Sequence, residues 1–374
     1  MFNSKGRALG FLVRVAVFFL VFMALGEVWL RWVTPADQPP LPYQDTQSAV
    51  FRFDANGPAS GLCTIGRLPR RAGRWRVNNA GWNSAIDYAA AAQRRRPAVA
   101  LFGDSYIEGF LTSVDQHVDA YLPQLLPACD AYAFGLSGWY LEQYVAVSRY
   151  AASHFQPGLL VIFIDSGDVS DSVRENGVIS DNLWQISGDQ GRFEEVRPTQ
   201  IYTASRNARL ARRSAIVSYL RFNAGVALPG ARSAAIAQPA PPADGAGGAA
   251  GVVSTEAWRR LLPPAAFMVG QLRADHPTTP ILFVSDSQRY LPLAAVGTTP
   301  NFADALALQA ACKGRPQFYF LDLRSAFSRD WSVHHRRFEA VDGAHWNAYA
   351  NLLVARTLAD FITNNRLLAG PSRR

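Results

Sequence analysis

Gly103-Asp104-Ser105 is the first of three short motifs whose residues suit acyl-transfer chemistry. It follows an apolar run and precedes a helical stretch, so the Ser105 hydroxyl is expected at a helix N-terminus. Free amide N–H groups and the helix dipole favour developing negative charge there. As a nucleophile, Ser105 would need a base to take its proton. The alternative is a simple helix cap, because Asp and Ser are both favoured at that position.

A candidate base lies near the C-terminus, in Asp342-Gly343-Ala344-His345. An imidazole accepts a serine proton when a carboxylate fixes its tautomer and orientation. An Asp three residues before a His can present both groups on one side of a turn. The motif follows the last apolar run and directly precedes a helical stretch over residues 347–364, which predicts a loop at the edge of the same sheet. A capping Asp followed by a surface His is the alternative.

The third motif, Gly135-Leu136-Ser137-Gly138, follows the second apolar run. Its two glycines allow close approach of the backbone and a backbone N–H aimed at an oxyanion. An ordinary turn between a strand and a helix would also fit.

The elements that must position these motifs alternate along the chain. Five short apolar runs, bounded by Gly, Pro or Asp, indicate strands buried on both faces of a parallel sheet: residues 98–102, 131–134, 159–164, 281–285 and 318–321. Stretches with apolar residues at helical spacing lie between them: residues 118–126, 140–154, 255–275 and 302–312. This alternation predicts a doubly wound α/β fold of three layers, with its ligand beyond the carboxyl ends of the strands.

Together the three motifs resemble the sequence blocks of the SGNH (GDSL-like) hydrolase superfamily. The stretch Arg76-Val77-Asn78-Asn79-Ala80-Gly81 resembles a lead-in of its membrane-anchored members, and His345-Trp346 is also seen in polysaccharide-acetylating relatives. The resemblance covers roughly residues 75–365. It implies a five-stranded parallel sheet in the flavodoxin-like order 2-1-3-4-5, and ester chemistry that needs neither a cofactor nor a metal.

The resemblance also implies the role of each site residue. Ser105 would be the nucleophile, His345 the general base and then acid, and Asp342 its orienting partner. The backbone N–H groups of Ser105 and Gly138 would form the oxyanion hole.

One block departs from the family pattern. It normally ends a strand with Gly-x-Asn-Asp, and the Asn side chain donates to the oxyanion, but Gly167 stands at that place here. Losing one such donor lowers a rate about a hundred- to thousandfold. Ser166 could substitute, Asn182 could reach the site from an insertion, or activity could be weak or absent. Asp165 and Asp168 are interpreted as caps of the next turn rather than ligands of a cation.

The N-terminus carries basic residues and then an apolar stretch over residues 9–33. Its uninterrupted part, residues 15–26, is short for a membrane span. Arg14 and Arg31 can extend it by snorkelling toward the two interfaces. We therefore expect an uncleaved, single-pass anchor in the inner membrane, with the basic end cytoplasmic and the remaining chain periplasmic. A signal peptide cleaved near Gly26 is the alternative.

The domain organisation follows from these patterns. Residues 1–33 are predicted as a cytoplasmic tip and transmembrane anchor, 34–74 as a linker and irregular lead-in, 75–365 as the catalytic domain and 366–374 as a disordered tail. An insertion over residues 170–260 interrupts the catalytic domain and contains a mobile Ala/Gly/Pro-rich loop at 225–253. Before that loop, residues 204–223 have the pattern of a basic amphipathic helix, with either a solvated face or a face that contacts a membrane surface.

Composition narrows the classes of partner. The net charge is +8, but no zinc-finger spacing, RNP-like stretch or array of basic helices indicates nucleic acid. Cys63, Cys129 and Cys312 form no CxxC pair and are interpreted as structural, with one disulfide allowed outside the cytoplasm. His117 and His276 show no metal-ligand spacing, and we expect both at the surface.

The sequence thus predicts a serine esterase that acts through an acyl-enzyme on an acyl ester, preferably an O-acetyl ester, of an extracytoplasmic glycan or small molecule. Two alternatives stay open. The same site could transfer the acyl group to a polysaccharide, or the protein could be a non-catalytic glycan-binding scaffold whose oxyanion hole is degenerate. Partners in the assembly of an envelope polysaccharide fit all three interpretations.

Overall fold

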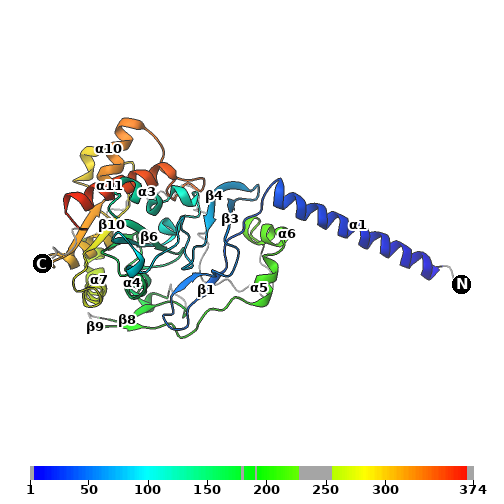
Figure 1. The fold of residues 1–374 in the computed structure, drawn as a ribbon, viewed down its shortest axis with the longest axis horizontal. Helices are drawn as coiled ribbons and strands as arrows, with labels where there is room; N and C mark the ends of the chain where they lie inside the picture. Colours follow the sequence, from blue (N-terminus) through cyan, green and yellow to red (C-terminus); the bar gives the residue numbers. More distant parts are fainter. Residues whose placement is uncertain (1–3, 178–180, 190–191, 227–254, 369–374) are drawn as a thin grey trace.

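The computed structural model describes residues 4–177, 181–189, 192–226 and 255–368 (Figure 1). Within them, a five-stranded parallel sheet lies between two layers of helices, which confirms the predicted α/β class. Its strands match the five apolar runs to within a residue at either end: β5 Ala98–Gly103, β6 Asp130–Gly135, β7 Leu159–Ile164, β10 Ile281–Ser285 and β11 Phe318–Asp322.

The order of the sheet is β6-β5-β7-β10-β11. Numbered among themselves along the chain, these strands read 2-1-3-4-5. The chain therefore reverses its direction of winding after β6, between β5 and β7. Ligands of open α/β sheets bind at the carboxyl ends of the strands that flank such a switch point.

Helices pack against both faces of the sheet (Figure 1). One face packs against α4 Leu141–Phe155, α7 Thr255–Asp275 and α9 Ala303–Cys312. The other packs against α3 Val118–Leu125, α10 Arg324–His334 and α11 Ala348–Asn364. Alternate residues of each strand face opposite layers, so Val99 and Leu101 join the second core while Ala100 and Phe102 join the first. Short helices complete the connections: α2 Ser105–Glu108 and α8 Leu293–Val296, with 3₁₀ turns at Ala91–Gln93, Val114–Gln116 and Arg174–Asn176.

The segment predicted as a linker, residues 34–74, is instead an integral part of the fold. It forms two antiparallel pairs, β1 Pro42–Gln44 with β2 Phe51–Phe53, and β3 Ser60–Ile65 with β4 Arg70–Arg76. Phe51 and Phe53 lie on one side of their strand because side chains alternate along it, and both are buried in the core under the sheet. The expectation of a linker was wrong, and for β1 and β2 the reason is that three-residue strands are too short to show their periodicity in a Pro-rich sequence.

The N-terminal helix α1, Ser4–Trp32, projects from the domain (Figure 1). Its part from Arg7 to Trp32 has 26 residues and contains an 18-residue window with a mean hydropathy of 2.5, so it is long and apolar enough to cross a membrane. At about 1.5 Å per residue it spans roughly 39 Å, against about 30 Å for the hydrocarbon core of a bilayer.

The expected insertion contains a hairpin, β8 Gln185–Asp189 with β9 Arg192–Val196. The amphipathic helix expected over residues 204–223 is broken into α5 Arg206–Ala211, α6 Ala215–Ser218 and a wide helical turn, Tyr219–Asn223. At the break, the Ser214 hydroxyl caps a new helix by accepting a hydrogen bond from Val217 N at 3.3 Å. Most of the 225–253 loop and of the 366–374 tail lies outside the described residues.

The three cysteines are free thiols in the structure. The surface position expected for two histidines was wrong. His117 is 3% exposed beneath Gly109, and burial lowers the pKa of its imidazole to about 4. His276 is 4% exposed, and its Nε2 lies 2.8 Å from Ser148 Oγ. Both pack as core residues.

Candidate active site

Ser105, His345 and Asp342 meet at the carboxyl edge of the sheet. His345 Nε2 lies 2.6 Å from Ser105 Oγ, and its Nδ1 lies 2.5 Å from Asp342 Oδ2. Ser105 follows β5, whereas Asp342 and His345 precede α11. The fold therefore brings Ser105 and His345 together although they are 240 residues apart in the sequence. The serine alcohol, imidazole and carboxylate are thus in the order that proton transfer requires.

The electrostatics of the carboxylate suit its place in this chain. Burial alone would raise the pKa of Asp342, but the hydrogen bond from His345 and its charge lower it below the ordinary value. The backbone N–H groups of Ala344 and His345 also donate to Asp342 Oδ1, each at 3.2 Å. The carboxylate is therefore ionised, and the turn fixes it against the imidazole.

The Ser105 side chain is positioned by the sharp transition from β5 to α2. Asp104 is the N-cap of α2, and its Oδ1 accepts a hydrogen bond from Tyr106 N at 3.0 Å. The capping interpretation of the motif is therefore correct for Asp104, while Ser105 becomes the first helical residue. Its hydroxyl thereby lies at the positive end of the helix dipole.

The turn after β6 lies beside the nucleophile. Gly138 has a φ of +77°, a conformation that glycine adopts without strain. Within the described chain, the N–H groups of Ser105 and Gly138 donate to no protein acceptor, so both are free for an oxyanion. Glu108, at the end of α2, holds this turn by accepting hydrogen bonds from the Ser137 hydroxyl and backbone N–H, and burial raises the pKa of its carboxyl to about 8.

The turn after β7 is closed by hydrogen bonds between its own backbone and side chains. Asp165 N donates to Asp168 Oδ2 at 2.8 Å, and Ser166 N donates to Asp165 Oδ1 at 2.7 Å. These two carboxylates thus cap the turn, as expected. Gly167 has a φ of +101°, and a Cβ there would lie 2.9 Å from Asp171 Oδ2. This backbone conformation strains any residue with a side chain. The turn as folded here therefore favours glycine over the expected Asn at position 167.

The two residues considered as replacement donors lie in different places. Ser166 is exposed, directly after β7, on the edge of the sheet that carries Ser105. Asn182 lies beside β1, where its backbone carbonyl accepts a hydrogen bond from Gln44 Nε2 at 2.7 Å. Position therefore favours Ser166 over Asn182.

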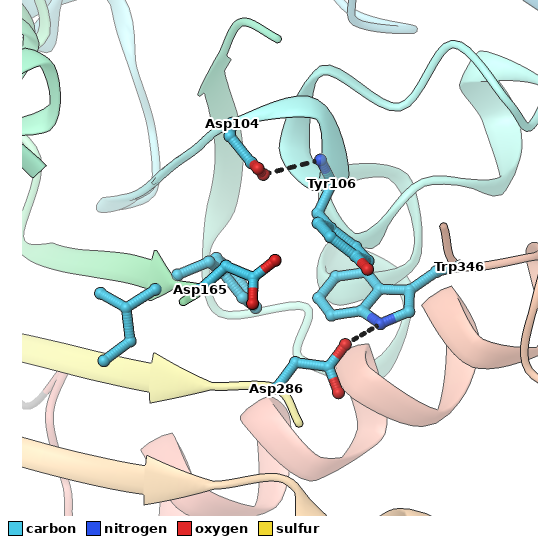
Figure 2. Close-up of a pocket in the computed structure, with 7 residues that line it drawn as sticks. Asp104, Tyr106, Asp165, Asp286 and Trp346 are labelled. Carbon is cyan, nitrogen blue, oxygen red and sulfur yellow. Dashed lines mark hydrogen bonds between the residues drawn. The ribbon is translucent and has the colours of Figure 1, made fainter. Parts of the chain in front are cut away.

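A network behind the imidazole was missed by the sequence analysis. Arg289 donates to both oxygens of Asp286, to Tyr106 Oη at 2.7 Å and to the Ala344 carbonyl at 2.6 Å. Trp346 Nε1 donates to Asp286 Oδ2 at 2.7 Å, as Figure 2 shows. Since Ala344 and Trp346 flank His345, this network fixes the loop that carries the base.

The same network lines a small pocket at the carboxyl ends of β5, β7 and β10 (Figure 2). Burial raises the pKa of Asp165 in this pocket to about 7, and the neighbouring Asp104 adds to the effect. No group of three or more His, Cys, Asp or Glu suited to a metal ion occurs among the residues described. One signal could have found the network: Asp286 directly follows β10, at the edge where polar residues gather.

Comparisons with known proteins give similarity at the level of fold only. No known family profile matches the chain, and no curated protein matches it in sequence. It is similar to a family 3 carbohydrate esterase from Clostridium thermocellum, with a TM-score of 0.37 and 12% identity over 74% of this chain and all of that one. It is also similar to a family 2 carbohydrate esterase from Corynascus thermopiles (Myceliophthora fergusii), with a TM-score of 0.36 and 11% identity over 75% and 68% of the two chains. A third is the salicylyl-acyltransferase SsfX3 of a tetracycline biosynthetic pathway, with a TM-score of 0.37 and 12% identity over 74% and 57%. Similarity this low does not establish an activity, so the chemistry is argued from the side chains.

Proposed function

We propose that this protein is a serine-dependent enzyme that cleaves or transfers the acyl group of an ester. The observation that carries the proposal is the contact of Ser105 Oγ with His345 Nε2 at 2.6 Å, together with that of His345 Nδ1 with Asp342 Oδ2 at 2.5 Å. A serine is a weak nucleophile by itself, and this pairing with an oriented base is what activates it.

The reaction proceeds in two steps. Ser105 Oγ attacks the ester carbonyl while His345 takes the hydroxyl proton, and the resulting oxyanion accepts hydrogen bonds from the Ser105 and Gly138 N–H groups. His345 then returns the proton to the leaving alcohol as the carbon–oxygen bond breaks, which leaves an acyl-serine. Water or an acceptor hydroxyl attacks this ester with His345 again as base, and the acid or a new ester is released.

The substrate class follows from where the catalytic domain is expected. With α1 as an inner-membrane anchor and its basic end in the cytoplasm, the active site faces the periplasm. An O-acetyl ester of an envelope glycan is the substrate that suits this place.

Turnover of p-nitrophenyl acetate by the full chain in detergent tests the proposal. We expect activity that Ser105→Ala abolishes and that the matched control Ser332→Ala retains. Ser332 is an exposed serine on α10, and its hydroxyl donates a hydrogen bond to a backbone carbonyl of the same helix. A folded wild-type protein without turnover would contradict the proposal and favour the scaffold interpretation. Repeating the assay with an oligosaccharide acceptor separates hydrolysis from transfer, since transfer gives an acetylated sugar in place of acetate.

A further inference from the structure

The junction between α1 and the domain is built from hydrogen bonds rather than left as a loose tether. Glu27, one turn before the end of α1, accepts hydrogen bonds from Ser214 Oγ at 2.9 Å and from the N–H groups of Ala215 and Ile216 at 2.7 and 3.1 Å. Arg31 pairs with Glu27 and donates to the Arg213 carbonyl. Helix α6 is therefore fixed at the level where α1 enters the domain.

The turn between β3 and β4 is linked to the same junction. Tyr219, which directly follows α6, donates its hydroxyl hydrogen bond to the Arg67 carbonyl at 2.9 Å. Asn223 Nδ2 donates to the carbonyls of Thr64 and Gly66, each at 3.3 Å. Figure 1 shows β3, β4 and α6 beside the domain end of α1. Segments about 150 residues apart thus form one surface around the exit of the helix.

This surface combines unpaired positive charge with one protruding apolar side chain. Leu68 is 85% exposed, the highest value among the large hydrophobic side chains of the described residues. Exposed arginines flank it on the turn, others lie on the α5–α6 segment, and none of them forms an ion pair with a carboxylate in the part of the chain that the structure describes. The membrane-proximal face comprises Arg67, Leu68, Arg70, Arg71, Arg206, Arg209 and Arg213.

The face lies at the level of a membrane interface if α1 spans the bilayer. Trp29 and Trp32, 56% and 77% exposed, stand at the domain end of α1, and tryptophan is favoured at the level of the lipid headgroups. Gly26 packs against Ile216 of α6 at this height, since a Cβ there would lie 3.4 Å from Ile216 Cδ1. Arginines at such a position meet the phosphate layer, and they are attracted most by anionic lipids.

We propose that the membrane-proximal face binds anionic phospholipid headgroups of the membrane that α1 spans, with Leu68 entering the interface between its arginines. The inference rests on the membrane anchor and not on the esterase activity. Its consequence is a fixed orientation of the catalytic domain, because contacts at α1, at the β3–β4 turn and at α5 together prevent rotation about the anchor.

An environment-sensitive fluorophore on Leu68→Cys tests this proposal in full-length protein reconstituted into nanodiscs. We expect a blue shift and a gain of emission in nanodiscs that contain phosphatidylglycerol, relative to phosphatidylcholine alone. The matched control is Val333→Cys, an equally apolar position, 66% exposed on α10, whose emission should not differ between the two lipids. Wild-type protein treated in the same way measures labelling of the native thiols.

Charge variants assign the effect to the arginines. Arg67→Gln, Arg70→Gln and Arg71→Gln together should abolish the difference between the two lipids at position 68. Gln substitutions at Arg336 and Arg337, exposed beyond the end of α10, should leave it intact. An equal emission in both lipids, from protein that co-elutes with the nanodiscs, would overturn the headgroup proposal alone. Failure to co-elute would overturn the anchor as well, whereas esterase activity in detergent is independent of both results.

Discussion

The proton-transfer half of the site, formed by Ser105, His345 and Asp342, differs from the oxyanion half, formed by the turns after β6 and β7. In the first half the two ring nitrogens of His345 have their partners at 2.5 and 2.6 Å, and a further network holds the loop behind the ring. In the second half two N–H groups are free and a third donor is missing from its expected place. The groups that would move a proton are therefore fully partnered, whereas those that would hold negative charge still have free donors. Substitutions in the two halves should therefore have effects of different size.

The largest effect is expected at the nucleophile. Ser105→Ala should lower kcat/KM on the order of 10⁴- to 10⁶-fold, because no acyl-enzyme can form. Steady-state turnover of p-nitrophenyl acetate measures this loss. A decrease of kcat/KM of less than tenfold would show that another group attacks the ester. The comparison of the proton-transfer half with the oxyanion half would then have no basis.

Asp342→Asn should have the next largest effect, about 10⁴-fold on kcat, because the amide no longer fixes the productive tautomer of His345. Thermal unfolding should be nearly unchanged, since Asn can keep hydrogen bonds with the Ala344 and His345 N–H groups. An active Asp342→Asn enzyme would mean that the 2.5 Å contact is only structural.

Removing the hydroxyl of Ser166 sharpens the account of the oxyanion half. If this hydroxyl replaces the missing Asn, as its exposed position after β7 suggests, Ser166→Ala should lower kcat about a hundredfold with little change in KM. Ser170→Ala is the control, because that hydroxyl bonds the Gly167 carbonyl and Asp171. An unchanged kcat would leave the N–H groups of Ser105 and Gly138 as the whole oxyanion hole.

Introducing at position 167 the Asn that the SGNH sequence block carries should not help. Gly167→Asn places a side chain at a φ of +101°, with Cβ 2.9 Å from Asp171 Oδ2, and should cost about 1–2 kcal/mol of the free energy of unfolding. We expect urea unfolding to detect this loss and turnover to show no gain. A rise in kcat would mean that the turn can adopt the conformation of the family.

A prediction about stability alone concerns Glu108, whose burial raises the pKa of its carboxyl from 4.5 to about 8. The folded state binds this proton more tightly than the unfolded state, so the stabilisation is complete below pH 4.5 and is lost as the pH rises through 8. Glu108→Gln cannot titrate, and its free energy of unfolding should therefore fall less than that of the wild type between pH 5 and 8. Parallel slopes of the two urea-derived profiles would contradict the buried carboxyl beneath Ser137.

Much of the framework could be predicted from the sequence because its signals are local. Each central strand is a continuous apolar run, since both faces of a parallel sheet are buried, and the Ser105 and His345 motifs each contain their own capping residue. The Arg289 network could not be predicted in this way. Its members come from three separate segments, and only the folded sheet brings Tyr106 and Ala344 to the guanidinium of Arg289.

The predictions for the N-terminal strand pairs β1–β2 and β3–β4 and for the 204–223 segment were wrong for a related reason. Phe51 and Phe53 are buried by strands too short to show a period, and the helix break at Ser214 depends on a carboxylate from Glu27, 187 residues earlier. Long-range partners of this kind override local helical propensity.

Peptide mapping of the adduct formed with a fluorophosphonate probe tests the central claim most directly. We predict that the folded wild-type protein carries the phosphonyl group on Ser105, and that His345→Ala suppresses this labelling while leaving the fold intact. An adduct on a different serine, or none at all on folded protein, would contradict the activation of Ser105 by His345.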